Sequence, residues 1–428
     1  MRKKPKKNLI SLVLVSVLLL VVWGGGATAA VVPELTQPVE LVIWHHWADH
    51  HPAEFQKLLD AFNEQHDMIT VVQQSHPRPE FDANLMNSLR AGVGPDIVPM
   101  FTSLAAFYVA QDLLLNLTPF IDDETIGIPG FRESIPEGKL RDISQFRDEQ
   151  IYMMPVMTGG LVFFYNKTLF DSLGLSAPAT WTELEETSRI LYEETGRPGF
   201  GMDSLACLFQ MLTMQAGEDY IDVETRTVAF DNETSVEKIA WFADLVQEGV
   251  FRLVGTDMFF SGPFGSEAVA AYIGNIAGYN FMRIAVDDKF EVGFAPPPQE
   301  GPVGFVPNFG PEFVAFRSTP ERGRAAYEFM RFLHQPENAA QWAIAFGGIP
   351  APLAALEVPM FQDYMEQNLA VQALASQVDR FGFLPAVPGA DAVRNEIVRM
   401  MESAALGIMT PEEALREGVA ASNSEIAP

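Results

Sequence analysis

The sequence predicts an α/β protein that is built from at least two lobes. The chain has 428 residues, more than the size at which a single hydrophobic core usually stops growing. Apolar residues make up 48% of the chain and aromatic residues 11%, enough for packed cores. Between residues 39 and 101, apolar segments of strand length alternate with segments of helical periodicity. This alternation is typical of a parallel α/β sheet.

The amino terminus has the features of a secretory signal. Basic residues without an acid precede an apolar run from Leu9 to Trp23, and small residues follow as far as Ala30. We expect a signal peptide over residues 1–30 and a periplasmic or extracellular mature protein. A retained membrane anchor is the alternative, but an uninterrupted span needs roughly 20 apolar residues and this apolar run is shorter. The only cysteine is Cys207, so we expect neither an intramolecular disulfide nor a lipid-bearing cysteine after the apolar run.

The formal net charge of −28 limits the possible partners. Nucleic acid and anionic membrane surfaces both bind basic patches, so we expect neither as a partner. The same charge argues against a strongly anionic ligand. We expect a monomer without a cofactor or a bound metal.

The elements follow in order along the chain. Residues 39–44 form an apolar strand that we expect to be buried on both faces. Pro52 can open the next helix, in which Phe55, Leu58, Leu59 and Phe62 recur at helical spacing. Further strands are expected over residues 69–73, 97–101, 151–155, 161–165, 269–273, 290–295 and 313–316. Helices are expected over residues 79–91, 104–111, 320–333 and 336–346, and residues 184–249 are mainly helical in periodicity. The rest of the chain to residue 421 is also expected to be helical, apart from a loop at residues 381–389.

Two glycine-containing stretches are candidate crossings between the lobes. Thr158-Gly159-Gly160 interrupts extended chain, and Gly347-Gly348-Ile349-Pro350 follows a helix. Glycine absorbs the dihedral changes of a hinge.

Several segments resemble one family in one order. After the secretory signal come LVIWHHW in the first strand, GVGPDIV (92–98) and LVFFYNKTLFDSLGLSAPATWTEL (161–184), then VGFAPPP (292–298), EFMRFLHQPENAAQWA (328–343) and TPEEALREGV (410–419). Together they are similar to the extracellular solute-binding proteins of ABC importers, in the carbohydrate-binding branch that includes maltose- and glycerol-3-phosphate-binding proteins. The likeness spans nearly all of the mature chain.

The resemblance implies a two-lobed periplasmic-binding-protein fold of type II, with a hinge and a central cleft. It implies a first lobe of residues 31–155 and 292–335 and a second lobe of residues 156–291 and 336–428. The protein would capture a carbohydrate in the cleft and deliver it to the permease subunits of an ABC transporter, without catalysis. By position, the family's ligand contacts would come from His45, His46, Trp47 and Asp49, from Phe101 and Ser103, from Thr158 and Asp203, and from Asn275, Tyr279 and Asn280.

The residue types at these positions suit a sugar, which offers hydroxyl groups and apolar C–H faces. Trp47 and Tyr279 are the candidates for stacking, whereas Trp44 inside the strand is expected in the core. His46, Asp49, Asn275, Asn280 and Asn308 are candidate hydroxyl partners, and each could equally be a loop cap. Ser103 and Asp203 could likewise cap a helix or face the ligand.

Three alternatives remain open. A glycerol-3-phosphate or polyol-phosphate ligand would need arginine for a bidentate clamp, and Arg78, Arg283 and Arg380 are the candidate sources. A zinc site is suggested by the histidine cluster from His45 to His51. An exported hydrolase or lyase with a catalytic histidine is the third, although paired carboxylates and a Ser-His arrangement at interpretable spacing are missing from the sequence.

Overall fold

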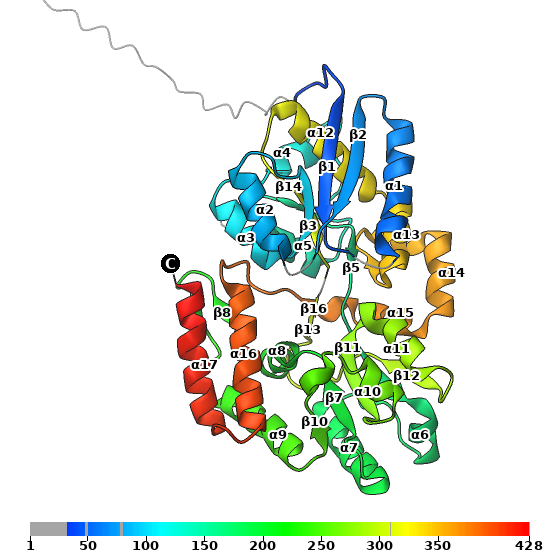
Figure 1. Ribbon diagram of the computed structural model, residues 1–428, viewed down its shortest axis with the longest axis vertical. Coiled ribbons are helices and arrows are strands. Elements are labelled where there is room, and N and C mark those ends of the chain that lie inside the picture. The colour runs from blue at the N-terminus through cyan, green and yellow to red at the C-terminus, as the bar shows by residue number, and fades with distance from the viewer. Residues whose placement is uncertain (1–31, 48–49, 78–79, 147, 309, 428) are drawn as a thin grey trace, which may run out of the picture. The chain divides into compact units, whose positions relative to one another are not determined.

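The structure, a computed structural model, describes residues 32–47, 50–77, 80–146, 148–308 and 310–427. The predicted signal peptide lies outside these residues, and so do Asp49 and Arg78. Within them, every helix is too short or too polar to cross a membrane. Two five-stranded sheets, each with its own helices, organise the described chain (Figure 1).

The first sheet has the strand order β2-β1-β3-β14-β4. Strand β1 (Val39–His45) lies parallel to β2 (Ile69–Ser75) and to β3 (Ile97–Met100), as the sequence predicts. Strand β14 (Glu312–Ala315) pairs antiparallel with β3 and with β4 (Met153–Met154). Alternate residues of β1 are buried and those between them are exposed or half-buried. The prediction that both faces of β1 are buried is therefore wrong, because the second face is only partly covered.

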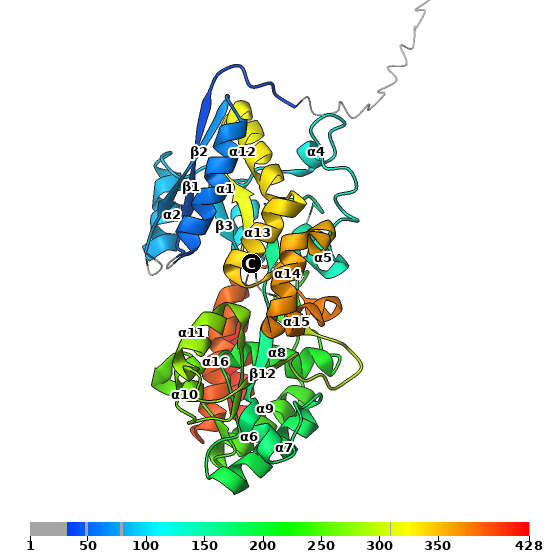
Figure 2. The same ribbon diagram turned by 90° about the vertical axis from the view of Figure 1, so that its right-hand side faces the viewer.

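Helices α1 (His51–Gln65), α12 (Pro320–Leu333) and α13 (Pro336–Phe346) belong to this lobe (Figures 1 and 2). Helix α1 has proline in its first turn and buries Phe55, Leu58, Leu59 and Phe62, the predicted apolar stripe. Helix α13 packs against α1, where the rings of Trp342 and Phe55 lie 4.9 Å apart.

The second sheet has the strand order β10-β7-β11-β6-β12. Strand β7 (Phe200–Met202) is parallel to β10 (Phe251–Arg252) and to β11 (Ala271–Asn275). Strand β6 (Leu161–Asn166) is antiparallel to β11 and to β12 (Val292–Ala295). Most of its residues are buried, which agrees with the apolar run LVFFY. This sheet forms the core of the second lobe.

Short strand pairs lie where the chain passes between the two sheets. Strand β5 (Met157–Thr158) pairs with β15 (Ile349–Pro350), at the two predicted crossings. Strand β13 (Val306–Pro307) pairs with β16 (Phe381–Gly382), so two further segments meet beside them.

The structure differs from the expected lobe boundaries at two places. Strand β12 pairs with β6, so the chain is still in the second sheet at residue 292 and returns to the first sheet only at β14. Helix α13 packs on α1 of the first lobe rather than in the second lobe. The helical pattern marks an apolar stripe but not the sheet that the stripe covers.

The other elements complete the two lobes. They are α2 (Phe81–Arg90), α3 (Thr102–Ala110), α4 (Thr118–Ile121), α5 (Glu137–Ser144), α6 (Lys167–Ser172), α7 (Trp181–Thr195), α8 (Leu205–Gln215), β8 (Ile221–Asp222), β9 (Thr227–Val228), α9 (Glu233–Gln247), η2 (Gly255–Asp257), α10 (Ser261–Gly265), η3 (Ile276–Gly278), α11 (Tyr279–Val286), η4 (Leu353–Glu357), α14 (Pro359–Gln367), α15 (Leu369–Ala375), η5 (Val378–Arg380), α16 (Ala390–Ala405) and α17 (Pro411–Ile426).

Candidate functional site

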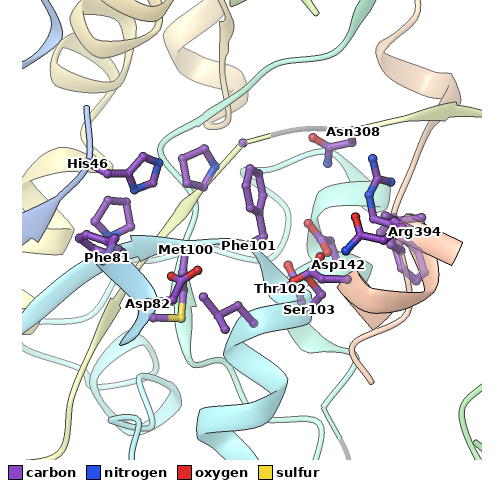
Figure 3. A pocket seen from close by; sticks show the side chains of 18 residues that line it. His46, Phe81, Asp82, Met100, Phe101, Thr102, Ser103, Asp142, Asn308 and Arg394 are labelled. Carbon is purple, nitrogen blue, oxygen red and sulfur yellow. The ribbon is translucent and has the colours of Figure 1, made fainter. Parts of the chain in front are cut away.

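A pocket of about 430 Å³ lies where the carboxyl ends of β1 and β3 face helix α16. We call it the α3–α16 pocket (Figure 3). Parallel neighbouring strands end at one edge of a sheet, which brings residues after β1 and β3 together. The pocket is lined by His46, Phe81, Asp82, Pro99, Met100, Phe101, Thr102, Ser103, Leu104 and Asp142 from the first lobe and by Asn308, Gly310, Pro311, Phe383, Leu384, Asp391, Arg394 and Asn395 from the crossings and α16.

The α3–α16 pocket combines aromatic rings with hydrogen-bonding groups. Phe101 is 40% exposed, and the His46 ring packs edge-on against Phe81 with centroids 5.2 Å apart. Ser103 caps no helix, because its hydroxyl donates to Asp391 Oδ1 of α16 at 2.9 Å. Four residues that the sequence singles out, His46, Phe101, Ser103 and Asn308, therefore meet in one pocket.

Arg394 gives the α3–α16 pocket a guanidinium that the sequence analysis did not single out. Helix α8 holds it, since Arg394 donates to Gln210 Oε1 at 3.2 Å and to Cys207 Sγ at 3.3 Å. Three carboxylates, Asp82, Asp142 and Asp391, line the same pocket. The acidic side chains outnumber the arginine, so the pocket as a whole does not favour an anion.

A second pocket of about 800 Å³ lies between α1 and α13 of the first lobe and η3 and α11 of the second. We call it the α1–α11 pocket. It holds the predicted residues Tyr279 and Asn280. His51 stacks on Phe346 with ring centroids 4.0 Å apart, and His50 Nε2 lies 3.0 Å from the Ala345 carbonyl oxygen. The remaining lining residues are Glu54, Lys57, Ile276, Ala277, Phe281, Ile284, Gln341, Ile344, Gly347, Met360, Tyr364 and Asn368.

His45 and Trp47 lie in the core of the first lobe and line neither pocket, which corrects the prediction that they contact a ligand. Trp47 is only 7% exposed and packs on Phe55 and Trp342, with ring centroids 4.9 and 4.8 Å away. His45 is fully buried, and its Nδ1 accepts the Trp47 N–H at 3.2 Å while Nε2 lies 2.8 Å from Gln73 Oε1. Burial lowers the pKa of His45, which favours the neutral ring that these two contacts require.

Three further predicted residues have structural partners and line neither large pocket. Thr158 is buried, and its hydroxyl donates to Asn308 Oδ1. Asn275 caps η3 by accepting the Ala277 N–H at 2.9 Å. Asp203 accepts the Phe260 N–H at 2.7 Å, and burial raises its pKa to about 6. The cap of α8 is Ser204, not Asp203. The loop-cap alternative thus describes Asn275, and Asp203 anchors a neighbouring turn.

Sequence reasoning missed much of both pockets. Asp142, Asp391, Arg394 and Asn395 reach the α3–α16 pocket from helices that the pattern marks only as helices. The one signal in the sequence that points to this part of the pocket is the predicted loop over residues 381–389. This loop precedes α16 and contains Phe383, which lines the pocket. In the α1–α11 pocket, the sequence predicts only that Phe346 belongs to a helix and does not indicate its place in the lining.

The described residues contain no group of three or more His, Cys, Asp or Glu side chains placed to hold a metal ion. The candidate zinc cluster is divided, since His45 faces the core, His46 the α3–α16 pocket, and His50 and His51 the α1–α11 pocket.

The structure has two α/β lobes that paired crossings connect, and both lobes contribute residues to the pockets between them. This arrangement defines a two-lobed solute-binding protein. A family model described as "Bacterial extracellular solute-binding protein" matches residues 57–368. The chain belongs to this family of extracellular proteins, which bind substrates and are not enzymes. The predicted family and the two-lobed α/β fold are confirmed.

Curated relatives include proteins with different ligands in their names. The chain is 22% identical to an sn-glycerol-3-phosphate-binding periplasmic protein of Pectobacterium atrosepticum, over 90% of both chains. It is 26% identical to an arabinooligosaccharide-binding protein of Halalkalibacterium halodurans, over 51% of this chain and 48% of the other.

Solved structures share the fold over nearly the whole chain. The sugar-binding protein MalE of Xanthomonas citri matches with a TM-score of 0.79 and 18% identity, covering 91% of this chain and 98% of its own. The cyclic alpha-maltosyl-1,6-maltose-binding protein of Arthrobacter globiformis matches with a TM-score of 0.77 and 22% identity, covering 91% and 99%.

Proposed function

We propose that this protein is the exported, monomeric substrate-binding component of an ABC importer and that its solute is a carbohydrate. The solute occupies the cleft formed by the α3–α16 and α1–α11 pockets, is bound without chemical change, and is passed to the permease subunits. The family assignment and the names of the sugar-binding relatives support this proposal.

The observation that carries the proposal is the make-up of the α3–α16 pocket. Exposed ring surface from Phe101 suits the apolar C–H face of a sugar. Carboxylate, amide and hydroxyl groups from Asp391, Asn395 and Ser103 suit its hydroxyl groups. The α1–α11 pocket adds Tyr279 and Asn280, which have the same two kinds of chemistry.

A polyol phosphate is the second candidate, because Arg394 lines the α3–α16 pocket and several relatives are named for sn-glycerol 3-phosphate. Of the arginines suggested by the sequence, Arg283 and Arg380 line neither pocket. The carboxylates of Asp82, Asp142 and Asp391 oppose a phosphate dianion in this pocket. We therefore favour the neutral carbohydrate.

Thermal unfolding with a panel of ligands tests the proposal. The panel contains neutral mono-, di- and oligosaccharides together with sn-glycerol 3-phosphate. A ligand at 100 times its dissociation constant stabilises the folded state by about 2.7 kcal/mol, so we expect a clear rise in melting temperature with at least one neutral sugar. A rise with the phosphate alone would establish the second candidate, and consumption of a sugar over time would contradict a binding role.

Phe101→Ala tests where the carbohydrate binds. We expect the dissociation constant to rise two- to tenfold, because an aromatic contact contributes about 0.5–1.5 kcal/mol. Phe107→Ala, in the helix that Phe101 precedes, is the matched control, since Phe107 is 37% exposed and lines neither pocket. Calorimetric titration of both variants gives the comparison. Equal affinities would remove Phe101 from the site.

A further inference from the structure

A buried charged cluster lies directly behind the α3–α16 pocket. Lys139 of α5 contacts Glu312 Oε1 of β14 at 2.5 Å and Asp142 Oδ2 of its own helix at 3.3 Å. Lys139 is 3% exposed and Glu312 is fully buried. Burying an ion costs several kcal/mol, and well-packed apolar residues of similar volume are often at least as stable as a buried ion pair. The cluster therefore calls for an explanation beyond stability.

The cluster continues into a chain of hydrogen bonds that reaches the second lobe. Gln145 Nε2 contacts Asp142 Oδ1 at 3.3 Å and the Leu384 carbonyl oxygen at 3.0 Å. Gln145 Oε1 accepts the Ala386 N–H at 2.6 Å. Glu312, Lys139, Asp142 and Gln145 therefore connect strand β14 of the first sheet to the segment that leads into α16. We call these four side chains the α5 relay.

The α5 relay reaches the ligand pocket at Asp142 and at Leu384, whose carbonyl oxygen Gln145 contacts. Both residues line the α3–α16 pocket, and Figure 3 shows Asp142 between Phe101 and Arg394. Glu312 is the register partner of Met100, another lining residue. A change at Glu312 can thus reach the pocket wall through direct contacts.

We propose that the α5 relay positions the wall of the α3–α16 pocket and makes solute affinity depend on the ionisation of Glu312. Lys139 and Gln145 are positioning residues, and Asp142 is the group that they present to the solute. The inference rests on the proposed function, because it assigns a role within the same binding site.

The surroundings of Glu312 place its titration near neutral pH. Burial raises the pKa of Glu312 to about 7, although Lys139 opposes the shift and Asp142 adds to it. Among the described charged groups, Lys139 and Asp142 are those that act on this carboxyl. A hydrogen bond from the Val156 backbone also opposes the rise in the pKa of Glu312.

Protonation of Glu312 changes the balance of charge around Lys139. With Glu312 ionised, Lys139 is shared between two carboxylates. With Glu312 neutral, Asp142 is the remaining anionic partner of Lys139, and its carboxylate is drawn towards the ammonium group. This movement weakens the contact with Gln145 and withdraws Asp142 from the pocket. Affinity therefore falls as the pH falls through about 7.

The test measures the dissociation constant of the best-binding sugar between pH 6 and pH 8. A carboxyl of this pKa is about nine-tenths ionised at pH 8 and about one-tenth at pH 6, so wild-type affinity should fall about tenfold. Glu312→Gln should bind weakly at both pH values, without the dependence. His46→Gln is the necessary control, because His46 also lines the pocket. A wild-type affinity that does not change with pH, or a dependence lost in His46→Gln and kept in Glu312→Gln, would overturn the relay.

Hydrogen exchange gives a readout that needs no ligand. The exchange rate of a peptide spanning residues 384–386 is compared between wild type and Glu312→Gln at each pH, which cancels the intrinsic effect of pH. We expect this ratio to differ between pH 6 and pH 8, and a constant ratio would refute the relay.

Where Glu312→Gln fails to fold, the double variant Lys139→Met/Glu312→Leu replaces the pair with apolar side chains and should bind without pH dependence. If no sugar binds, the proposed function fails while exchange still decides the relay.

Discussion

Strands β1 and β3 are neighbours in one sheet and both end in aromatic side chains, yet the two ends have different roles. After β1, Trp47 turns inward and is only 7% exposed. After β3, Phe101 stays 40% exposed and lines the α3–α16 pocket. Position in the sheet is nearly the same, so it does not explain the difference.

The difference comes from what covers each strand end. Trp342 and Phe346 of α13 lie against Trp47, with ring centroids 4.8 and 5.5 Å away. The end of β3 faces α16 across a cavity instead. An aromatic residue at the carboxyl end of a strand is therefore a ligand contact only where a later part of the chain leaves it uncovered.

Trp47→Ala should have the largest effect, and the effect should be on stability. Truncation of a buried tryptophan costs about 3–5 kcal/mol, from lost transfer energy and an unfilled cavity. Urea unfolding measures this loss, and titration with the solute should show a dissociation constant within about threefold of wild type. Trp44→Ala is the control, because Trp44 is half-buried and should cost less. A large loss of affinity with unchanged stability would return Trp47 to the binding site.

The buried ring of His45 should make stability depend on pH. His45 is buried and its pKa is lowered, so the unfolded chain binds a proton more readily than the folded protein. The stability that this neutral ring contributes is present above about pH 6.5 and is lost as the pH falls towards the lowered folded-state pKa. His45→Gln should therefore reduce the difference in unfolding free energy between pH 7.5 and pH 5, measured by urea unfolding at each pH. A difference as large as that of the wild type would contradict the role of the buried neutral ring.

Much of the fold could be predicted because the local patterns are strong. The apolar run of β1, the proline that opens α1 and the stripe ending at Phe62 each specify their element without help from distant residues. The sequence does not predict the strands β7 (Phe200–Met202) and β10 (Phe251–Arg252), because strands of two or three residues show no alternation and the surrounding pattern is helical. The lobe boundaries were displaced because pairing with a particular sheet, as for β12 with β6, is a long-range choice.

Less of the site could be predicted, because exposure depends on contacts between distant segments. His50 and Ala345 meet across 295 residues of sequence, and α13 is also what hides Trp47. Arg394 and Asp391 reach the pocket only because α16 lies opposite β3. Strand-end residues such as Phe101 and Ser103 were found, since the end of a parallel strand is a local feature. The helices that complete the pocket leave no such local mark.

Ser103→Ala should have the smallest effect and shows most finely how the end of β3 is used. Its hydroxyl bonds Asp391 across the α3–α16 pocket, at a site exposed to solvent, so we expect unfolding free energy to change by less than about 0.5 kcal/mol. When a sugar binds, we expect the Ser103 hydroxyl to leave Asp391 and to form a hydrogen bond with a hydroxyl group of the sugar. A hydrogen bond contributes about 0.5–1.5 kcal/mol net. The dissociation constant should therefore rise about two- to tenfold. Ser172→Ala, outside both pockets, is the matched control. If Ser103→Ala binds the solute more tightly, the Ser103–Asp391 hydrogen bond instead holds α3 and α16 together in competition with the solute. The end of β3 would then contribute the ring of Phe101 to binding but not the hydroxyl of Ser103.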